Sequence, residues 1–77
     1  MRVSIIITNY NYGRFLARAI DSALQQTHPH VQTIVVDDAS TDNSRDIIAR
    51  YGDRVVPVLL ARNAGQGAAF NAGFRAS

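Results

Sequence analysis

The chain has 77 residues, 47% of them hydrophobic, and its eight arginines and six aspartates leave a formal net charge of +2. This composition excludes a disordered protein, because disordered chains combine low hydrophobicity with high net charge. The lack of cysteine excludes a disulfide scaffold and a cysteine-based zinc site. No apolar run approaches the roughly 18 residues of a membrane span, and no signal-peptide pattern follows Met1, so we expect neither.

The arginines are scattered along the sequence, so we do not predict a basic face that binds nucleic acid. A chain of this length forms at most one small domain, which buries only about 60% of the surface that the unfolded chain exposes. No disulfide compensates for the small core. We therefore expect the chain to be part of a larger domain or to associate with a second copy.

Three short apolar runs predict β-strands, at residues 3–8, 31–36 and 54–60. Their nearly continuous apolar character is typical of strands that are buried on both faces of a parallel sheet. Pro57 cannot donate a ladder hydrogen bond, so we expect the third strand at an edge of the sheet.

A helical pattern follows each predicted strand. The helices are expected from Arg14 up to Pro29, from the polar segment ending at Ser44 up to Gly52, and over residues 68–76. The first helix has an apolar stripe that should face the sheet, formed by Phe15, Leu16, Ala19, Ile20, Ala23 and Leu24. We expect Asn11 to cap the first helix, and Thr41 or Asp42 to cap the second. The alternation predicts an α/β fold, a three-layer arrangement around a parallel sheet.

Polar residues follow every predicted strand, at the edge where parallel α/β sheets bind ligands. They are Thr8, Asn9, Tyr10 and Asn11 after the first strand, Asp37 and Asp38 after the second, and Asn63, Gly65 and Gln66 after the third. Two adjacent carboxylates are costly without a donor, a cation or a ligand. A carboxylate can accept a hydrogen bond from a nucleobase, and a tyrosine can stack on its face. The alternative, that these residues only form turns and caps, stays open.

We do not predict a binding role for two other candidate motifs, a glycine-rich loop and a pair of histidines. Residues 65–70 contain two glycines of a dinucleotide-binding loop, but Phe70 replaces the third glycine and the segment follows the wrong strand. His28 and His30 flank Pro29 without a third metal ligand nearby, so we interpret them as turn residues.

Several segments taken together resemble the family 2 glycosyltransferases, which have the GT-A fold. They are residues 3–11, 15–16, 19–27, 34–42 and 63–73, in family order and at family-like spacing. The resemblance implies that residues 1–77 are the Rossmann-like, nucleotide-sugar-binding N-terminal half of a truncated GT-A domain. It implies nucleotide-binding roles for Thr8, Asn9, Tyr10, Asp37, Asp38, Gln66 and Asn71. Within this set Asp38 would bind the base, and Asp37 would mainly order the loop.

The resemblance also implies a reaction: inverting transfer of a sugar from a nucleotide-sugar, in most members a UDP-sugar, to an acceptor hydroxyl, here in cell-envelope polysaccharide synthesis. The intact enzyme is expected to need a divalent cation (Mg or Mn). The cation's ligands and the catalytic base are expected outside this chain, which would bind nucleotide without turnover. We expect a cytoplasmic location, with any contact to the membrane face made by other parts. A free-standing nucleotide-binding module and a self-associating homo-oligomer stay open as alternatives.

The sequence departs from the family pattern in three places. Thr8 stands where proline is commonest, and a basic residue found in some members after the position of Gly65 is missing. Ala39 replaces the usual glycine, so its loop must either avoid positive φ or be strained.

Overall fold

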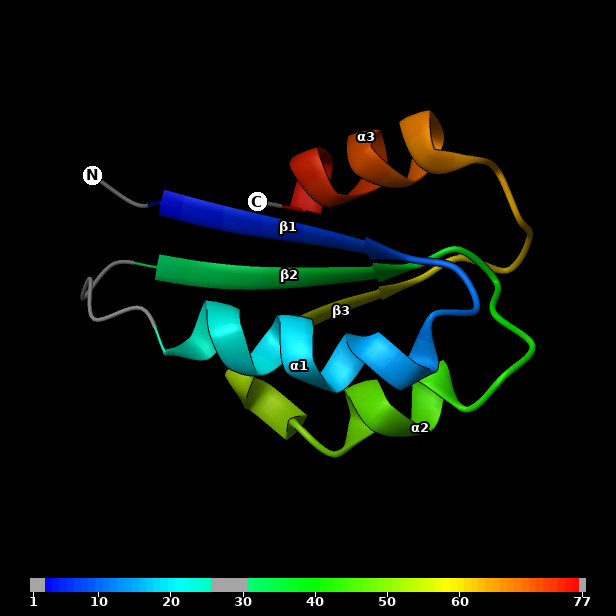
Figure 1. Cartoon of the computed structure of the whole chain (residues 1–77). Helices are drawn as coiled ribbons and strands as arrows, with labels where there is room; N and C mark the ends of the chain where they lie inside the picture. Colours follow the sequence, from blue (N-terminus) through cyan, green and yellow to red (C-terminus); the bar gives the residue numbers. More distant parts are fainter. Residues whose placement is uncertain (1–2, 26–30, 77) are drawn as a thin grey trace.

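The computed structural model describes residues 3–25 and 31–76, except for the side chain of Gln66. A parallel sheet in the order β1-β2-β3 consists of β1 (Val3–Asn9), β2 (Val31–Asp37) and β3 (Val56–Leu59). Helices α1 (Gly13–Leu24) and α2 (Ser44–Ala49) cover one face of this sheet, and α3 (Gln66–Ala76) covers the other (Figure 1). The predicted α/β class, the three layers and the parallel pairing are confirmed.

The central strand β2 is buried on both faces. Ile34 and Val36 pack with Ala69 of α3, whereas Val35 packs with Leu16 and other side chains of the α1 and α2 layer. Successive side chains of a strand point to opposite faces, so the middle of a strand covered on both sides is apolar without alternation. This explains the run of three apolar residues at positions 34–36, all of which are fully buried.

The strand β3 lies at one edge of the described sheet, as Pro57 predicted. It begins two residues later than expected, because Gly52–Arg54 form a short 3₁₀ turn before it. Helix α3 begins at Gln66, two residues earlier than the sequence indicated.

The helix α1 buries only part of its predicted apolar stripe. Leu16, Ile20 and Ala23 are buried, but Phe15 is 56% exposed and Ala19 is also exposed. The prediction that these two residues face the core is wrong. Both line a groove beside β1, on whose outer side no described strand lies.

The prediction that Asn11 caps α1 is also wrong. The N-cap position belongs to Tyr12, which makes no side-chain capping bond. The Oδ1 atom of Asn11 instead accepts the backbone N–H groups of Thr41 at 2.8 Å and Asp42 at 3.2 Å. The side chain therefore joins the loop after β1 to the loop after β2.

The N-cap residue of α2 is Asn43, and not Thr41 or Asp42 as predicted. The Asp42 carboxylate nevertheless accepts hydrogen bonds from backbone N–H groups at the starts of both α1 and α2. Its Oδ2 accepts the N–H of Gly13 at 2.9 Å, and its Oδ1 accepts the N–H of Ser44 at 2.9 Å. Hydrogen bonds from the Ser44 hydroxyl and from the Gly13 N–H lower the pKa of the Asp42 carboxyl. A Cβ atom on residue 13 would lie 2.4 Å from Oδ1 of Asn43 and 3.0 Å from Oδ2 of Asp42, so any other residue there would require these side chains to shift.

Ala39 has a φ of +61°, so the loop after β2 is strained rather than rearranged. We predict that Ala39→Gly raises the free energy of unfolding by about 1 kcal/mol, because glycine relieves the left-handed strain. The same change at Ala68, which is exposed in α3, should lower it by roughly 0.5–1 kcal/mol. Urea unfolding of both variants measures this difference, and a loss of stability in both would contradict it.

Candidate functional site

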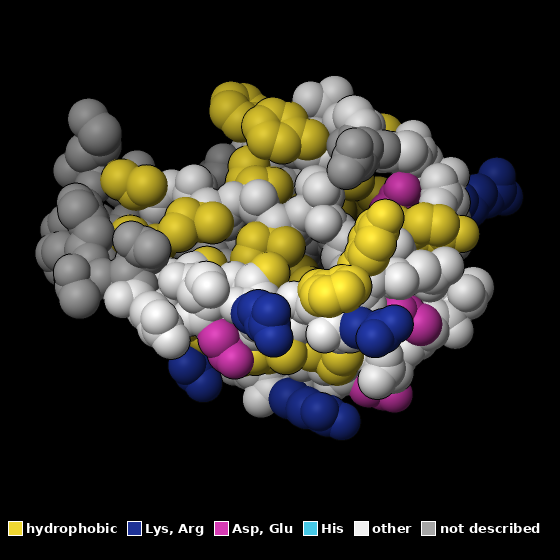
Figure 2. Space-filling view, in the orientation of Figure 1, with side chains coloured by type: hydrophobic (Ala, Val, Ile, Leu, Met, Phe, Trp, Pro, Cys, Tyr) yellow, Lys and Arg dark blue, Asp and Glu magenta, His cyan; other side chains and the backbone are white. Residues whose placement is uncertain are grey.

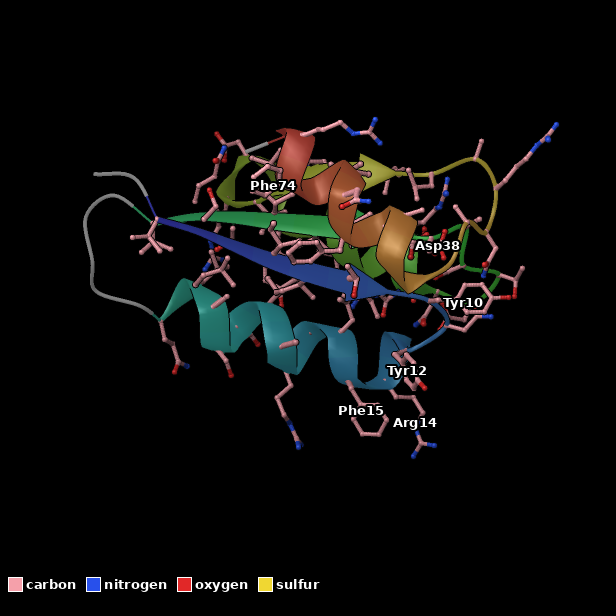
Figure 3. All side chains as sticks on the ribbon, turned by 90° about the horizontal axis from the view of Figure 1, so that it is seen from above. Tyr10, Tyr12, Arg14, Phe15, Asp38 and Phe74 are labelled. Atoms are coloured by element: carbon pink, nitrogen blue, oxygen red, sulfur yellow. The ribbon has the colours of Figure 1, made fainter. Side chains whose placement is uncertain are left out.

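A cavity of about 360 Å³ opens at the carboxyl ends of the strands. Its lining comes from the end of β1, from the loops after the three strands and from α3: Thr8, Asn9, Tyr10, Tyr12, Asp38, Asn63, Gly65 and Ala69. Tyr10, Tyr12 and Asp38 lie together at this end of the molecule (Figure 3). The position is the one at which open parallel α/β sheets bind ligands.

The Asp37 carboxylate is fully buried and does not line the cavity, but it binds Asn9, which does. Its Oδ1 accepts from the Ser40 hydroxyl at 2.6 Å and from the Asn9 amide at 3.0 Å. Its Oδ2 accepts from the Ser40 N–H and from Nε of Arg45, both at 3.0 Å. Arg45 also donates to the carbonyl oxygen of Leu60, so the ends of all three strands are joined.

These hydrogen bonds set the charge state of Asp37. Burial raises the pKa of the Asp37 carboxyl, but hydrogen bonds from the Ser40 side chain and backbone, from Asn9 and from Arg45 outweigh it, and the net pKa is below its ordinary value. The folded-state pKa is therefore lower than the unfolded-state pKa. The ionised carboxylate contributes stability above a pH of about 4, and this contribution is lost as the pH falls through the folded-state pKa.

The neighbouring carboxylate, Asp38, lines the cavity and holds the backbone at Ala64 and Gly65. Its Oδ1 accepts the N–H of Ala64 at 2.7 Å, and its Oδ2 accepts the N–H of Gly65 at 3.0 Å. Gly65 has a φ of +88°, which glycine adopts without strain. Each carboxylate oxygen can accept more than one hydrogen bond, so Asp38 keeps acceptor capacity toward the cavity.

Two tyrosines form the rim of the cavity. Tyr10 is 43% exposed and Tyr12 is 64% exposed. Asn11 between them has a φ of +57°, and with this turn of the backbone both tyrosines line the same cavity. An exposed aromatic ring at a rim can stack on a planar ligand at low cost in conformational entropy.

Of the residues to which the family resemblance gives nucleotide-binding roles, the structure brings together four, Thr8, Asn9, Tyr10 and Asp38. Asn63 and Gly65, which are predicted only as polar residues after the third strand, also line the cavity. Asp37 is buried and does not line the cavity, and Asn71 is exposed on α3 without lining it. The side chain of Gln66 lies outside the described part of the chain, as do the two histidines, His28 and His30.

Two residues of the site were not predicted from the sequence: Tyr12, which lines the cavity, and Arg45, which binds Asp37. A signal for Tyr12 existed: asparagine tolerates left-handed backbone better than most residues, so Asn11 could have indicated a turn that brings both tyrosines to one side. Nothing in the local sequence distinguishes Arg45 from the arginines on the surface.

Among the described residues, no three His, Asp, Glu or Cys side chains are grouped so that they could hold a metal ion. The carboxylates of Asp37 and Asp38 accept hydrogen bonds from different loops and do not converge.

Within the described ranges, 3–25 and 31–76, no helix has the length and apolarity to cross a bilayer.

The fold and the cavity define an α/β domain of the class that binds ligands at the strand ends. The sequence matches the model of glycosyl transferase family 2 over residues 4–77, so the chain belongs to this family. It is 53% identical, over its whole length, to an uncharacterized glycosyltransferase of Nostoc sp.. It is 41% identical, over 97% of its length, to the succinoglycan biosynthesis protein ExoO of Rhizobium meliloti. The chain spans about a quarter of the length of these relatives, 25% and 22%.

Solved structures of glycosyltransferases share the fold. TarS 1–349 of S. aureus in complex with UDP-GlcNAc gives a TM-score of 0.88 at 27% identity, over 100% of this chain and 24% of that one. The mannosyltransferase PcManGT of Pyrobaculum calidifontis in complex with GDP-Man and Mn²⁺ gives 0.84 at 25% identity, over 99% and 24%. The predicted GT-A fold and family are confirmed.

We predict that Asp37→Asn lowers the free energy of unfolding at pH 7 by about 2 kcal/mol, because an amide NH₂ would face the donors of Ser40 and Arg45. The deficit should shrink as the pH falls below about 4, because the unfolded wild-type chain then binds a proton at this carboxyl before the folded chain does. Urea unfolding at pH 7 and pH 3 measures both values. Asp46→Asn, on the exposed side of α2, is the control and should change stability by less than about 1 kcal/mol. A deficit that does not depend on pH would contradict the assignment.

Proposed function

We propose that this chain is the nucleotide-binding part of a glycosyltransferase that uses a nucleotide-sugar donor. The observation that carries the proposal is the cavity at the strand ends, with two tyrosines on its rim and the Asp38 carboxylate in its wall. Its volume of about 360 Å³ lies at the lower end of the range of small-molecule sites, which suits a nucleoside better than a whole nucleotide-sugar. Membership of family 2 and the nucleotide-sugars bound by the structural relatives support it.

In the proposed binding mode the base lies against Tyr10 and donates an N–H to Asp38. Thr8 contacts the nucleoside, while Asn9 and Asp37 hold the loops in place. The diphosphate extends toward the start of α3, near Gln66 and Asn71. We favour a uridine nucleotide because its small base presents one N–H donor to a single carboxylate. TarS was solved with UDP-GlcNAc and PcManGT with GDP-Man, so a comparison of the two nucleotides is the natural test.

For the parent protein we propose transfer with inversion. The acceptor hydroxyl attacks the anomeric carbon as the bond to the diphosphate breaks, and a base takes the hydroxyl proton. We assign the base and the ligands of a divalent cation to residues outside this chain, which spans about a quarter of the length of its relatives. The name of ExoO supports a role in polysaccharide synthesis, which we place in the cytoplasm.

We predict that Tyr10→Ala and Asp38→Asn each weaken UDP binding about tenfold in titration calorimetry. The first removes a stacking surface, and the second makes the acceptor of the base N–H neutral. Asp46→Asn on α2 is the matched control for the loss of one carboxylate and should bind as the wild type does. Circular dichroism checks that each variant is folded, because Asp38 also holds Ala64 and Gly65. Unchanged affinity in both site variants would refute the binding mode.

We also predict that the 77-residue chain does not transfer sugar. With UDP-GlcNAc, Mn²⁺ and simple sugar acceptors, UDP release should not exceed that of the Asp38→Asn variant. Release that is faster in the wild-type chain and yields a glycosylated acceptor would show that the catalytic groups are present.

A further inference from the structure

The turn between β1 and α1 is held against the end of β2 and the loop after it, residues 37–42, by every second residue. Asn9 donates through its side-chain amide at 3.0 Å, and the backbone N–H groups of Asn11 and Gly13 each donate at 2.9 Å. Each of these bonds goes to a different side chain of residues 37–42. The turn is therefore fixed along its whole length and not at a single point.

The residues between these contacts are the two tyrosines of the cavity rim. Tyr10 lies between Asn9 and Asn11, and Tyr12 lies between Asn11 and Gly13. Both tyrosines line the cavity, and Figure 3 shows them at the same end of the molecule. Because the backbone is held on both sides of each tyrosine, these contacts determine where the two rings lie. Asn11 is the anchor that the two rings share.

Asn11 binds the loop after β2 with both its backbone and its side chain. Its N–H donates to the hydroxyl oxygen of Ser40, and its Oδ1 accepts the N–H groups of Thr41 at 2.8 Å and Asp42 at 3.2 Å. Its φ of +57° lies in the left-handed region, which asparagine adopts more readily than most residues. The side chain therefore secures a backbone conformation that the turn requires.

The rim offers ring surface and little charge. Among the described residues that line the cavity, Asp38 alone is charged. On the face shown in Figure 2, charged side chains lie mainly over α1 and α2, and hydrophobic side chains lie between these helices and α3. A second ring beside the first enlarges the area that a base and its ribose can contact. Tyrosine supplies such area at low cost in conformational entropy.

We propose that Tyr12 contacts the nucleotide together with Tyr10, and that Asn11 is the positioning residue that holds both rings at the rim. This role rests on the proposed function, because it takes the ligand of the cavity to be a nucleotide. Asn11 is not among the residues that line the cavity, so it acts through its neighbours. Without its contacts the turn adopts several conformations, and the apparent affinity falls with the fraction that is competent to bind.

The test is titration calorimetry of the 77-residue chain with UDP. Asn11→Gly removes the side-chain acceptor but adopts the left-handed backbone without strain, and we expect it to weaken binding about fivefold. Asn11→Asp keeps an acceptor oxygen at this position and tolerates the same backbone, so it should restore most of that loss. Tyr12→Ala should weaken binding about fivefold, because it removes one ring of the rim.

A double variant separates positioning from a general loss of stability. If Asn11 acts through the rings, Asn11→Gly costs less affinity in the Tyr12→Ala background than in the wild-type chain. Tyr51→Phe is the matched control, because it removes the hydrogen bonds of the Tyr51 hydroxyl to Ala17 and Asp21 away from the cavity, and it should bind UDP as the wild type does. Effects that simply multiply would overturn the proposal, as would an unchanged affinity in Asn11→Gly or in Tyr12→Ala.

A second measurement does not need a nucleotide. The chain has three tyrosines and no tryptophan, so in the Tyr51→Phe variant the near-ultraviolet circular dichroism of tyrosine comes from Tyr10 and Tyr12. Adding Asn11→Gly should reduce this signal while the far-ultraviolet spectrum stays that of the folded chain, and Asn11→Asp should restore it. An unchanged signal refutes the positioning role, whereas a wild-type chain that does not bind UDP refutes the proposed function, so the two failures are distinguishable.

Discussion

A buried carboxylate at the end of β2 is the constraint on which the site depends. A charge that is removed from water must find donors, and Asp37 finds them in Asn9, Ser40 and Arg45, from three different segments. Each donor is thereby held in place. Arg45 also donates to the carbonyl oxygen of Leu60 after β3, so the end of β3 is held as well. Desolvation of one ionised group thus brings the three strand ends together, and the cavity forms between the loops that leave them.

The loops after β1 and β2 are built as one unit. Asn11 accepts backbone N–H groups from the second loop, and Asp42 of the second loop accepts the N–H of Gly13 at the start of α1. These bonds satisfy groups that a helix start and an irregular loop would otherwise leave without partners. The positive φ angles of Asn11 and Ala39 are maintained by this cross-linking. Strain in the loops is therefore offset by hydrogen bonds between them.

The sequence was sufficient for the strands, the parallel sheet and the edge position of β3, since these follow from periodicity, from chain order and from Pro57. It was not sufficient for the caps. Asn11 binds the backbone 30 residues away, and Asp42 binds Gly13, 29 residues away, in addition to its neighbour Ser44, whereas local patterns describe only neighbours along the chain. The exposure of Phe15 has a similar cause. Periodicity places it on the apolar side of α1, but whether it is covered depends on what lies beyond β1.

The roles of the two adjacent carboxylates are determined by the fold and not by their neighbourhood in the sequence. Side by side in the sequence, Asp37 and Asp38 suggest either repulsion or a shared cation. Successive residues at a strand end point in opposite directions, so the two carboxylates face different surroundings. Asp37 is satisfied by side chains and by the N–H of Ser40, and Asp38 by the backbone N–H groups of Ala64 and Gly65. Asp37 therefore stabilises the fold, and Asp38 holds the loop at Gly65, which lines the cavity.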